Sequence, residues 1–198
     1  MNDIKNMVKY ARNFFISSVI ATILSIPVAN AATEDETEFL KAAFSTKSET
    51  IKQLLEKGIN INYQNEMGFS ALIIASQYGH ADIVHLLLEK GANVDLKNAG
   101  GATALIIAAK NGHADVVTAL LAKGAQFDVQ TTDGITALML AIQKGHEGIV
   151  DALLAKGANI NLQTKDKVTA LMIAALEGRA SIVDKLLEKG AKIDVQAS

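Results

Sequence analysis

The sequence has no cysteine and no tryptophan, and its 198 residues include a single proline. Without cysteine, the chain can form neither a disulfide framework nor a cysteine-based zinc site, and it has no thiol nucleophile. Aromatic residues make up only 5% of the chain, and the formal net charge of −2 gives no sign of a surface that binds nucleic acid. The hydrophobic fraction of 49% is nevertheless too high for a disordered chain, and the length is sufficient for one domain with a core.

The first 31 residues have the pattern of an export signal. Three basic residues precede an uncharged run over 14–28, and Ala29 and Ala31 form the small-x-small pattern of a signal peptidase site. The run is shorter than the span of about 20 residues that a transmembrane helix needs. We therefore predict a signal peptide over 1–31, typical of a bacterial protein, and a mature domain over 32–198 with no stable membrane insertion. The predicted location is periplasmic or secreted, and the alternative is an uncleaved N-terminal anchor.

The rest of the chain repeats one unit of 33 residues. Glycine recurs at this spacing in several series, and such self-similarity is the signature of a solenoid. One series consists of Gly58, Gly91, Gly124, Gly157 and Gly190. The pattern predicts five units, at approximately 34–62, 63–95, 96–128, 129–161 and 162–194.

Each unit has the pattern of two short amphipathic helices. In the second unit we expect helices over about 71–78 and 81–90, and Val84, Leu87 and Leu88 give the second helix a buried stripe. The segments between units alternate and contain a glycine, which favours an extended hairpin. A single helix pair cannot bury its apolar face, so neighbouring pairs must stack. The expected fold is an all-α solenoid of about five helix-turn-helix units joined by β-hairpin loops.

The third unit contains the fixed positions that make the pattern specific. These are Gly101-Ala102-Thr103-Ala104-Leu105, Ala108-Ala109, Gly112-His113, Val116-Val117, Leu120-Leu121 and Gly124-Ala125. The unit resembles the ankyrin repeat, and the resemblance covers about residues 34–195.

The sequence also departs from the ankyrin pattern. Alanine replaces the proline at the start of the first helix, and the histidine two positions later becomes, for example, Ile106. In the family that histidine forms hydrogen bonds between neighbouring hairpins, so its loss suggests that packing replaces this polar network. In the last unit Lys167 stands where glycine is expected, and we expect that turn to differ.

Polar residues replace apolar ones in the terminal units. At one position of the second helix the internal units have Leu86 or alanine, whereas the end units have Gln53 and Lys185. The first helix of the first unit has Lys41 where the second unit has Ile74. Because a terminal repeat has one face against water, these replacements predict caps at both ends of a complete array.

The sequence carries little that could perform catalysis. His146-Glu147 begins like the helix of a zinc protease, but Val150 stands at the position of the second histidine. His80 and His113 occupy the same position as His146 in their own units, and stacked helices lie about 8–10 Å apart, which is too far for one shared metal. No phosphate-binding glycine loop occurs. We predict no catalytic residue, no metal site and no cofactor.

The ankyrin resemblance implies a non-catalytic scaffold that binds an unidentified protein through hairpin tips and the exposed side of the first helices. We expect a monomer with no nucleic-acid partner. The alternatives are a secreted effector or a toxin-neutralising protein, and the least favoured is an enzyme or metal-handling protein. The positions carried over as partner-binding candidates are Phe44, Glu66, Met67, Phe69, Gln77, Tyr78, Lys110, Asn111, Asp133 and Ile135. For the row Phe69, Ala102, Ile135 and Val168, packing between hairpins is an equal alternative to binding.

Overall fold

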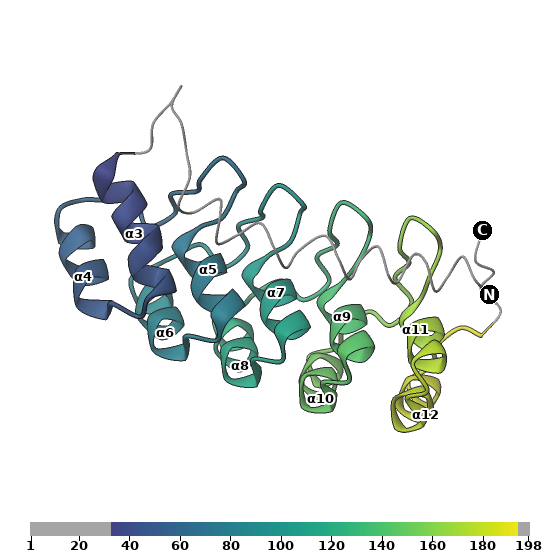
Figure 1. Ribbon diagram of the computed structural model, residues 1–198. Coiled ribbons are helices and arrows are strands. Elements are labelled where there is room, and N and C mark those ends of the chain that lie inside the picture. The colour runs from purple at the N-terminus through teal and green to yellow at the C-terminus, as the bar shows by residue number, and fades with distance from the viewer. Residues whose placement is uncertain (1–32, 194–198) are drawn as a thin grey trace.

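The computed structural model describes residues 33–193, and over this range the helices form two stacked rows (Figure 1). The first helices of the repeats, called the inner helices below, are α3 (Glu34–Phe44), α5 (Ala71–Tyr78), α7 (Ala104–Asn111), α9 (Ala137–Lys144) and α11 (Ala170–Leu176). The second helices, called the outer helices, are α4 (Ser48–Glu56), α6 (Ala81–Glu89), α8 (Ala114–Ala122), α10 (Glu147–Ala155) and α12 (Ala180–Glu188). The solenoid predicted from the 33-residue period is confirmed. The proposed signal peptide lies outside the described residues.

The ends of the inner helices follow from local sequence. Ser70 precedes α5, and its hydroxyl oxygen accepts a hydrogen bond from the Ile73 N–H at 3.3 Å. Threonines fill the same role before α7, α9 and α11. Gly79 ends α5 in the left-handed conformation, with φ of 72°, which glycine adopts without steric penalty. A capped start and a glycine stop explain why α5, α7 and α9 each span eight residues.

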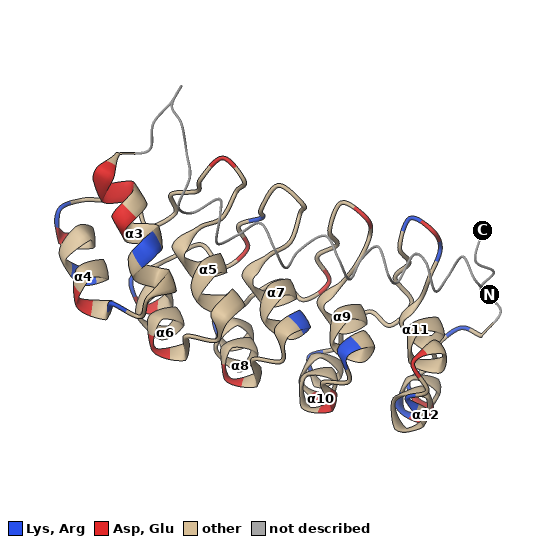
Figure 2. Cartoon of the chain, in the orientation of Figure 1, with Lys and Arg blue, Asp and Glu red and all other residues tan. Residues whose placement is uncertain are grey.

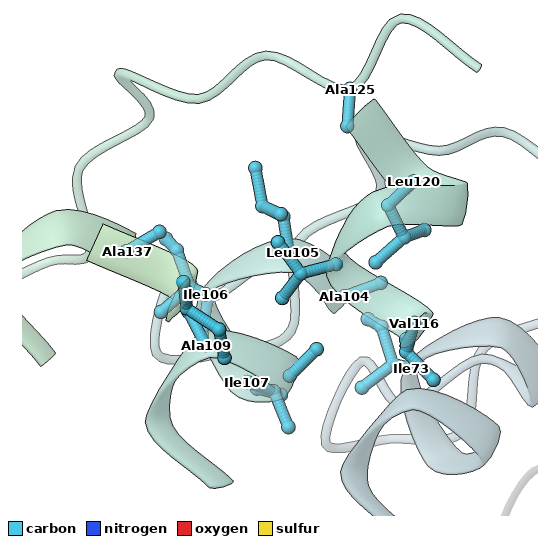
Figure 3. Packing of buried hydrophobic residues seen from close by; sticks show 14 of the residues in the cluster. Ile73, Ala104, Leu105, Ile106, Ile107, Ala109, Val116, Leu120, Ala125 and Ala137 are labelled. Carbon is cyan, nitrogen blue, oxygen red and sulfur yellow. The ribbon is translucent and has the colours of Figure 1, made fainter. Parts of the chain in front are cut away.

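The core runs continuously through the stack because each inner helix is covered on most sides. In α7 every residue of 104–109 is buried, and the helix packs against α5, α9 and α8 (Figure 3). Leu105 and Ile106 lie in the first turn of this helix, and Leu120 of α8 lies on the side of the helix that carries Leu105. Each repeat contacts only its neighbours, so the core has no single centre.

The loops between repeats project as hairpins from one side of the stack (Figure 1). Neighbouring tips are joined by backbone hydrogen bonds: the Ala99 N–H donates to the Met67 carbonyl at 2.9 Å. The next two tips repeat this bond, with Thr132 donating to Gly100 and Lys165 donating to Asp133. Strand pairing within the described part is limited to the isolated bridges Gln64–Ser70 and Gln163–Thr169. The hairpins are therefore ordered turns rather than a sheet.

The expectation that the Lys167 turn differs is wrong. Lys167 has φ of 58° and its N–H donates to the Thr164 carbonyl at 2.9 Å, which matches Gly134 and Thr131 one repeat earlier. The reason lies in the neighbouring hairpin. A Cβ on Gly134 would lie 2.8 Å from the Thr164 Cα, whereas Lys167 is exposed on the last described hairpin. Glycine is needed where the next hairpin approaches closely, and lysine is tolerated at the last hairpin, which no further hairpin approaches within residues 33–193.

The expectation that packing replaces the polar network between hairpins is correct only in part. Ile106 is buried, as packing requires. Polar links nevertheless persist, because the side-chain amide of Gln64 donates to the Lys97 carbonyl at 2.9 Å and that of Gln130 donates to the Gln163 carbonyl at 2.8 Å. Glutamine side chains therefore add hydrogen bonds between neighbouring hairpins to the packing.

The C-terminal cap expected from Lys185 is also wrong. The Lys185 Nζ lies 2.6 Å from the Asp151 Oδ1 of the preceding repeat, so this side chain faces back into the stack. Gln53, at the same position of α4, does lie exposed at the N-terminal end. On the far side of α12 the described residues leave Leu187 exposed. The polar cap is thus present at one end of the described stack and not at the other.

Candidate protein-binding surface

The predicted binding residues fall into two places. Glu66 and Asp133 are exposed at hairpin tips, and Met67 and Ile135 are half-buried beside them. The other candidates, apart from Phe69, lie on the C-terminal turns of the inner helices. These are Phe44, Gln77, Tyr78, Lys110 and Asn111.

Phe69 offers a partner almost no surface, because its exposed fraction is 4%. Its counterparts Ala102 and Val168 are 3% and 8% exposed. These three side chains therefore pack against the core. Ile135, the fourth member of this series, is half-buried. Each of them directly precedes the residue that caps an inner helix, where the hairpin closes over the core.

We define the inner-helix row as the surface formed by the last turns of α3, α5, α7 and α9. Phe44 is 38% exposed, Asn111 and Lys144 are exposed, and the remaining members are half-buried. Lys110 and Lys144 lie in the last turns of α7 and α9, Lys41 lies in the last turn of α3, and the last turn of α5 is uncharged (Figure 2). The members are Phe44, Gln77, Tyr78, Lys110, Asn111, Gln143 and Lys144.

An aromatic cluster occupies the N-terminal part of this row. The rings of Phe44 and Tyr78 meet edge to face, with centroids 4.8 Å apart and planes at 84°. The Tyr78 ring also stacks on His80 at 6.0 Å. The His80 Nε2 lies 2.8 Å from the Phe44 carbonyl oxygen, and because a carbonyl only accepts, this nitrogen donates. Burial raises the pKa of Tyr78, against the opposing effect of a hydrogen bond from Gln77. The cluster is held in one arrangement.

Amides and lysines continue the row. The Asn111 side chain donates to the Gln77 carbonyl at 2.9 Å, and the His113 Nε2 donates to the same oxygen at 3.0 Å. Burial, followed by the positive charge of Lys144, lowers the pKa of Lys110. The Lys110 carbonyl in turn lies 3.3 Å from the His146 Nε2. These contacts fix the backbone of the row and give its far part a positive character.

The contact between Phe44 and Tyr78 was missed by sequence reasoning, which treated the two as separate candidates. The residues are 34 positions apart, which is one repeat period plus one residue. That offset places neighbouring side chains diagonally across two stacked helices. The spacing was therefore a usable signal, although it does not give the ring geometry.

The row offers apolar contact, amide hydrogen bonds and positive charge. Within 33–193, no group of three or more His, Asp or Glu side chains is arranged to hold a metal ion. The helices of the same range are all too short or too polar to cross a membrane.

The family model described as ankyrin repeats in three copies matches residues 39–131 and again 105–197. Together the two matches span 39–197, well over half of the chain. No curated protein matches the sequence. Repeats of this kind generally mediate protein–protein interaction and typically form scaffolds without catalytic activity.

Proposed function

Because the chain belongs to the ankyrin repeat family, we propose that it is an exported, non-catalytic scaffold that binds another protein through the hairpin tips and the inner-helix row. The observation that supports this most directly is the aromatic cluster of Phe44 and Tyr78. The core of α3 consists of other residues, so packing within the helix does not require an exposed phenylalanine at its last position. Aromatic side chains on a surface are enriched at the centres of protein interfaces.

Partner capture tests the binding proposal. The full gene is expressed with a C-terminal tag, and retained proteins are quantified by mass spectrometry. We expect one protein to be retained specifically and to be lost from the Phe44→Ala/Tyr78→Ala variant, provided that its helicity and melting temperature are unchanged. If only the Glu66→Ala/Met67→Ala variant failed to retain the protein, the binding site would lie at the hairpin tips. Failure to retain any specific protein would overturn the proposal.

The proposed export has its own test. The charge pattern and the small residues before position 32 support cleavage after Ala31. N-terminal sequencing of the protein made from the full gene should then begin at Ala32. An intact Met1 recovered in the membrane fraction would favour the anchored alternative.

A further inference from the structure

We infer that the inner-helix row takes an acidic segment of the partner protein in extended form. An apolar side chain of that segment contacts Phe44 and Tyr78, and its carboxylates contact Lys110 and Lys144. This inference rests on the proposed function and adds the chemistry of the partner.

The charge of the row differs from that of the whole protein. The chain has 21 acidic residues against 19 lysines and arginines. From α3 to α9, however, the last two residues of each inner helix include no carboxylate, and an acidic residue, Glu177, first stands at the position of Lys144 in the next repeat. The two lysines of the row lie in adjacent repeats on one face (Figure 2). A local excess of positive charge on an acidic protein favours a partner segment of opposite charge.

The two lysines are not explained by helix electrostatics alone. Cations near a helix C-terminus interact favourably with its dipole, and Lys110 and Lys144 both lie in last turns. Yet the last turn of α5 contains no basic residue, so this turn forms without lysine. Burial is the main cause of the lowered pKa of Lys110, and the positive charge of the neighbouring Lys144 lowers that pKa further. Carboxylates from a partner would relieve that repulsion.

The aromatic part of the row is suited to hold an apolar side chain. The Phe44 and Tyr78 rings already contact each other, and the His80 ring stacks on Tyr78. Side chains that are ordered before binding lose little conformational entropy on binding. The aromatic end is therefore a preformed anchor for the segment.

The spacing of the repeats predicts the spacing within the segment. Stacked helices lie about 8–10 Å apart, and an extended chain rises about 3.3 Å per residue. Lys110 is one repeat from Tyr78 and Lys144 is two repeats from it. The acidic residues of the segment should thus lie about three and about six residues from its apolar anchor.

Selection from a random 12-residue peptide library displayed on phage tests the inference on the purified protein. We expect enriched peptides to carry one large apolar residue and two acidic residues at about these spacings. A synthetic peptide of the enriched sequence should bind about tenfold more weakly to Lys110→Gln/Lys144→Gln. It should bind about thirtyfold more weakly to Phe44→Ala/Tyr78→Ala. The charge-reversed variant Lys110→Glu/Lys144→Glu should select basic peptides instead.

The matched control is Lys123→Gln/Lys156→Gln. These exposed lysines follow α8 and α10, the outer helices of the same two repeats, so the control removes the same charge from the opposite row. Peptide affinity should be unchanged in this variant. Circular dichroism and melting temperature confirm that each variant is folded.

The outcomes separate the inference from the proposed function. Enriched peptides without acidic residues, bound equally by Lys110→Gln/Lys144→Gln, would overturn the inference while partner capture still supports the function. If Lys123→Gln/Lys156→Gln lost as much peptide affinity as Lys110→Gln/Lys144→Gln, the loss would come from the net charge of the protein, and the inference would also be overturned. The absence of any enriched peptide would overturn the inference as well. Binding to phosphatidylserine vesicles or single-stranded DNA that depends on both lysines, with no acidic peptide selected, would overturn it in favour of those ligands.

Discussion

The two ends of the described stack differ in the side chains on the face that no further described repeat covers. At the N-terminal end, Lys41 stands where the next repeat has the buried Ile74, and Gln53 stands where it has Leu86. Polar side chains thus replace apolar ones on the outward face, as expected for a terminal repeat.

At the C-terminal end the last described repeat keeps, on the outward face of α12, the leucine of the internal repeats. Leu187 is 39% exposed, whereas Leu154 at the same position one repeat earlier is 6% exposed. Leu176 and Ile193 are exposed as well. The comparison shows that the burial of a repeat position is determined by its neighbour and not by the repeat itself.

The largest expected effect is at a leucine position of the outer helix, compared between an internal repeat and the last described repeat. Leu121 is 8% exposed between two repeats, and Leu187 is its counterpart in α12. Leu121→Ala should lower the free energy of unfolding by about 2–5 kcal/mol, because it leaves a cavity. Leu187→Ala should lower it by about 1 kcal/mol or less, since much of this side chain is already in water. Urea denaturation measures both, and equal losses would show that the last repeat is covered.

A smaller effect is expected at the hairpin turn. Gly101 has φ of 76°, and a Cβ there would lie 2.9 Å from the Thr132 backbone nitrogen. Gly101→Ala should therefore lower the free energy of unfolding by about 1–3 kcal/mol. At the equivalent Lys167, replacement by glycine should raise it by up to about 1 kcal/mol, because a left-handed conformation is unfavourable for lysine. Thermal melts of the two variants should shift in opposite directions, and shifts in the same direction would contradict the stacking argument.

Exchanging the polarity of the two end faces should change exposed apolar surface more than stability. Leu176→Gln/Leu187→Lys should reduce the fluorescence of a hydrophobic dye, because both leucines are exposed. Gln53→Leu should increase it by adding an apolar side chain at the exposed N-terminal end. These substitutions should shift the free energy of unfolding by about 1 kcal/mol or less, because the replaced side chains are partly in water already. A dye signal that stays constant in both variants would mean that neither face is accessible.

The smallest effect is expected at Lys185. The hydrogen bond to Asp151 raises the pKa of Lys185, so the charged form is favoured in the folded state. Its contribution to stability is present below the ordinary pKa of 10.5 and is lost as the pH rises through the raised value. Lys185→Ala should lower the melting temperature slightly at neutral pH and low salt, and the difference should vanish at high salt and above the raised pKa. A difference that persists in high salt would point to packing instead.

The repeat period and the helices could be predicted from the sequence because their causes are local. The hydroxyl of Ser70 and the backbone freedom of Gly79 start and end α5 within eight residues. The prediction for the second helix ended at Lys90, one residue beyond the observed end at Glu89. Such signals depend on the residues within one helix and need no knowledge of the neighbouring repeats.

The candidate surface was predicted less completely. Phe44, Tyr78, Lys110 and Asn111 were assigned to the inner helices correctly, but Phe69 in the same set is buried. The sequence places a residue on a helix or a hairpin, whereas its exposure depends on the repeat stacked beside it. Whether these residues bind a partner stays a prediction.

By itself the sequence determined the 33-residue period, the helix pairs and the turns of this protein, because each follows from a residue's own backbone preference and from the apolar spacing within one unit. Only the tertiary structure decided that Lys185 faces backward to Asp151, that Lys167 fits a glycine turn and that Phe44 meets Tyr78. Each of these depends on the distance to the next repeat or on the absence of one from the described residues. In a molecule built by stacking, identical positions acquire different environments, and the environment is a property of the stack.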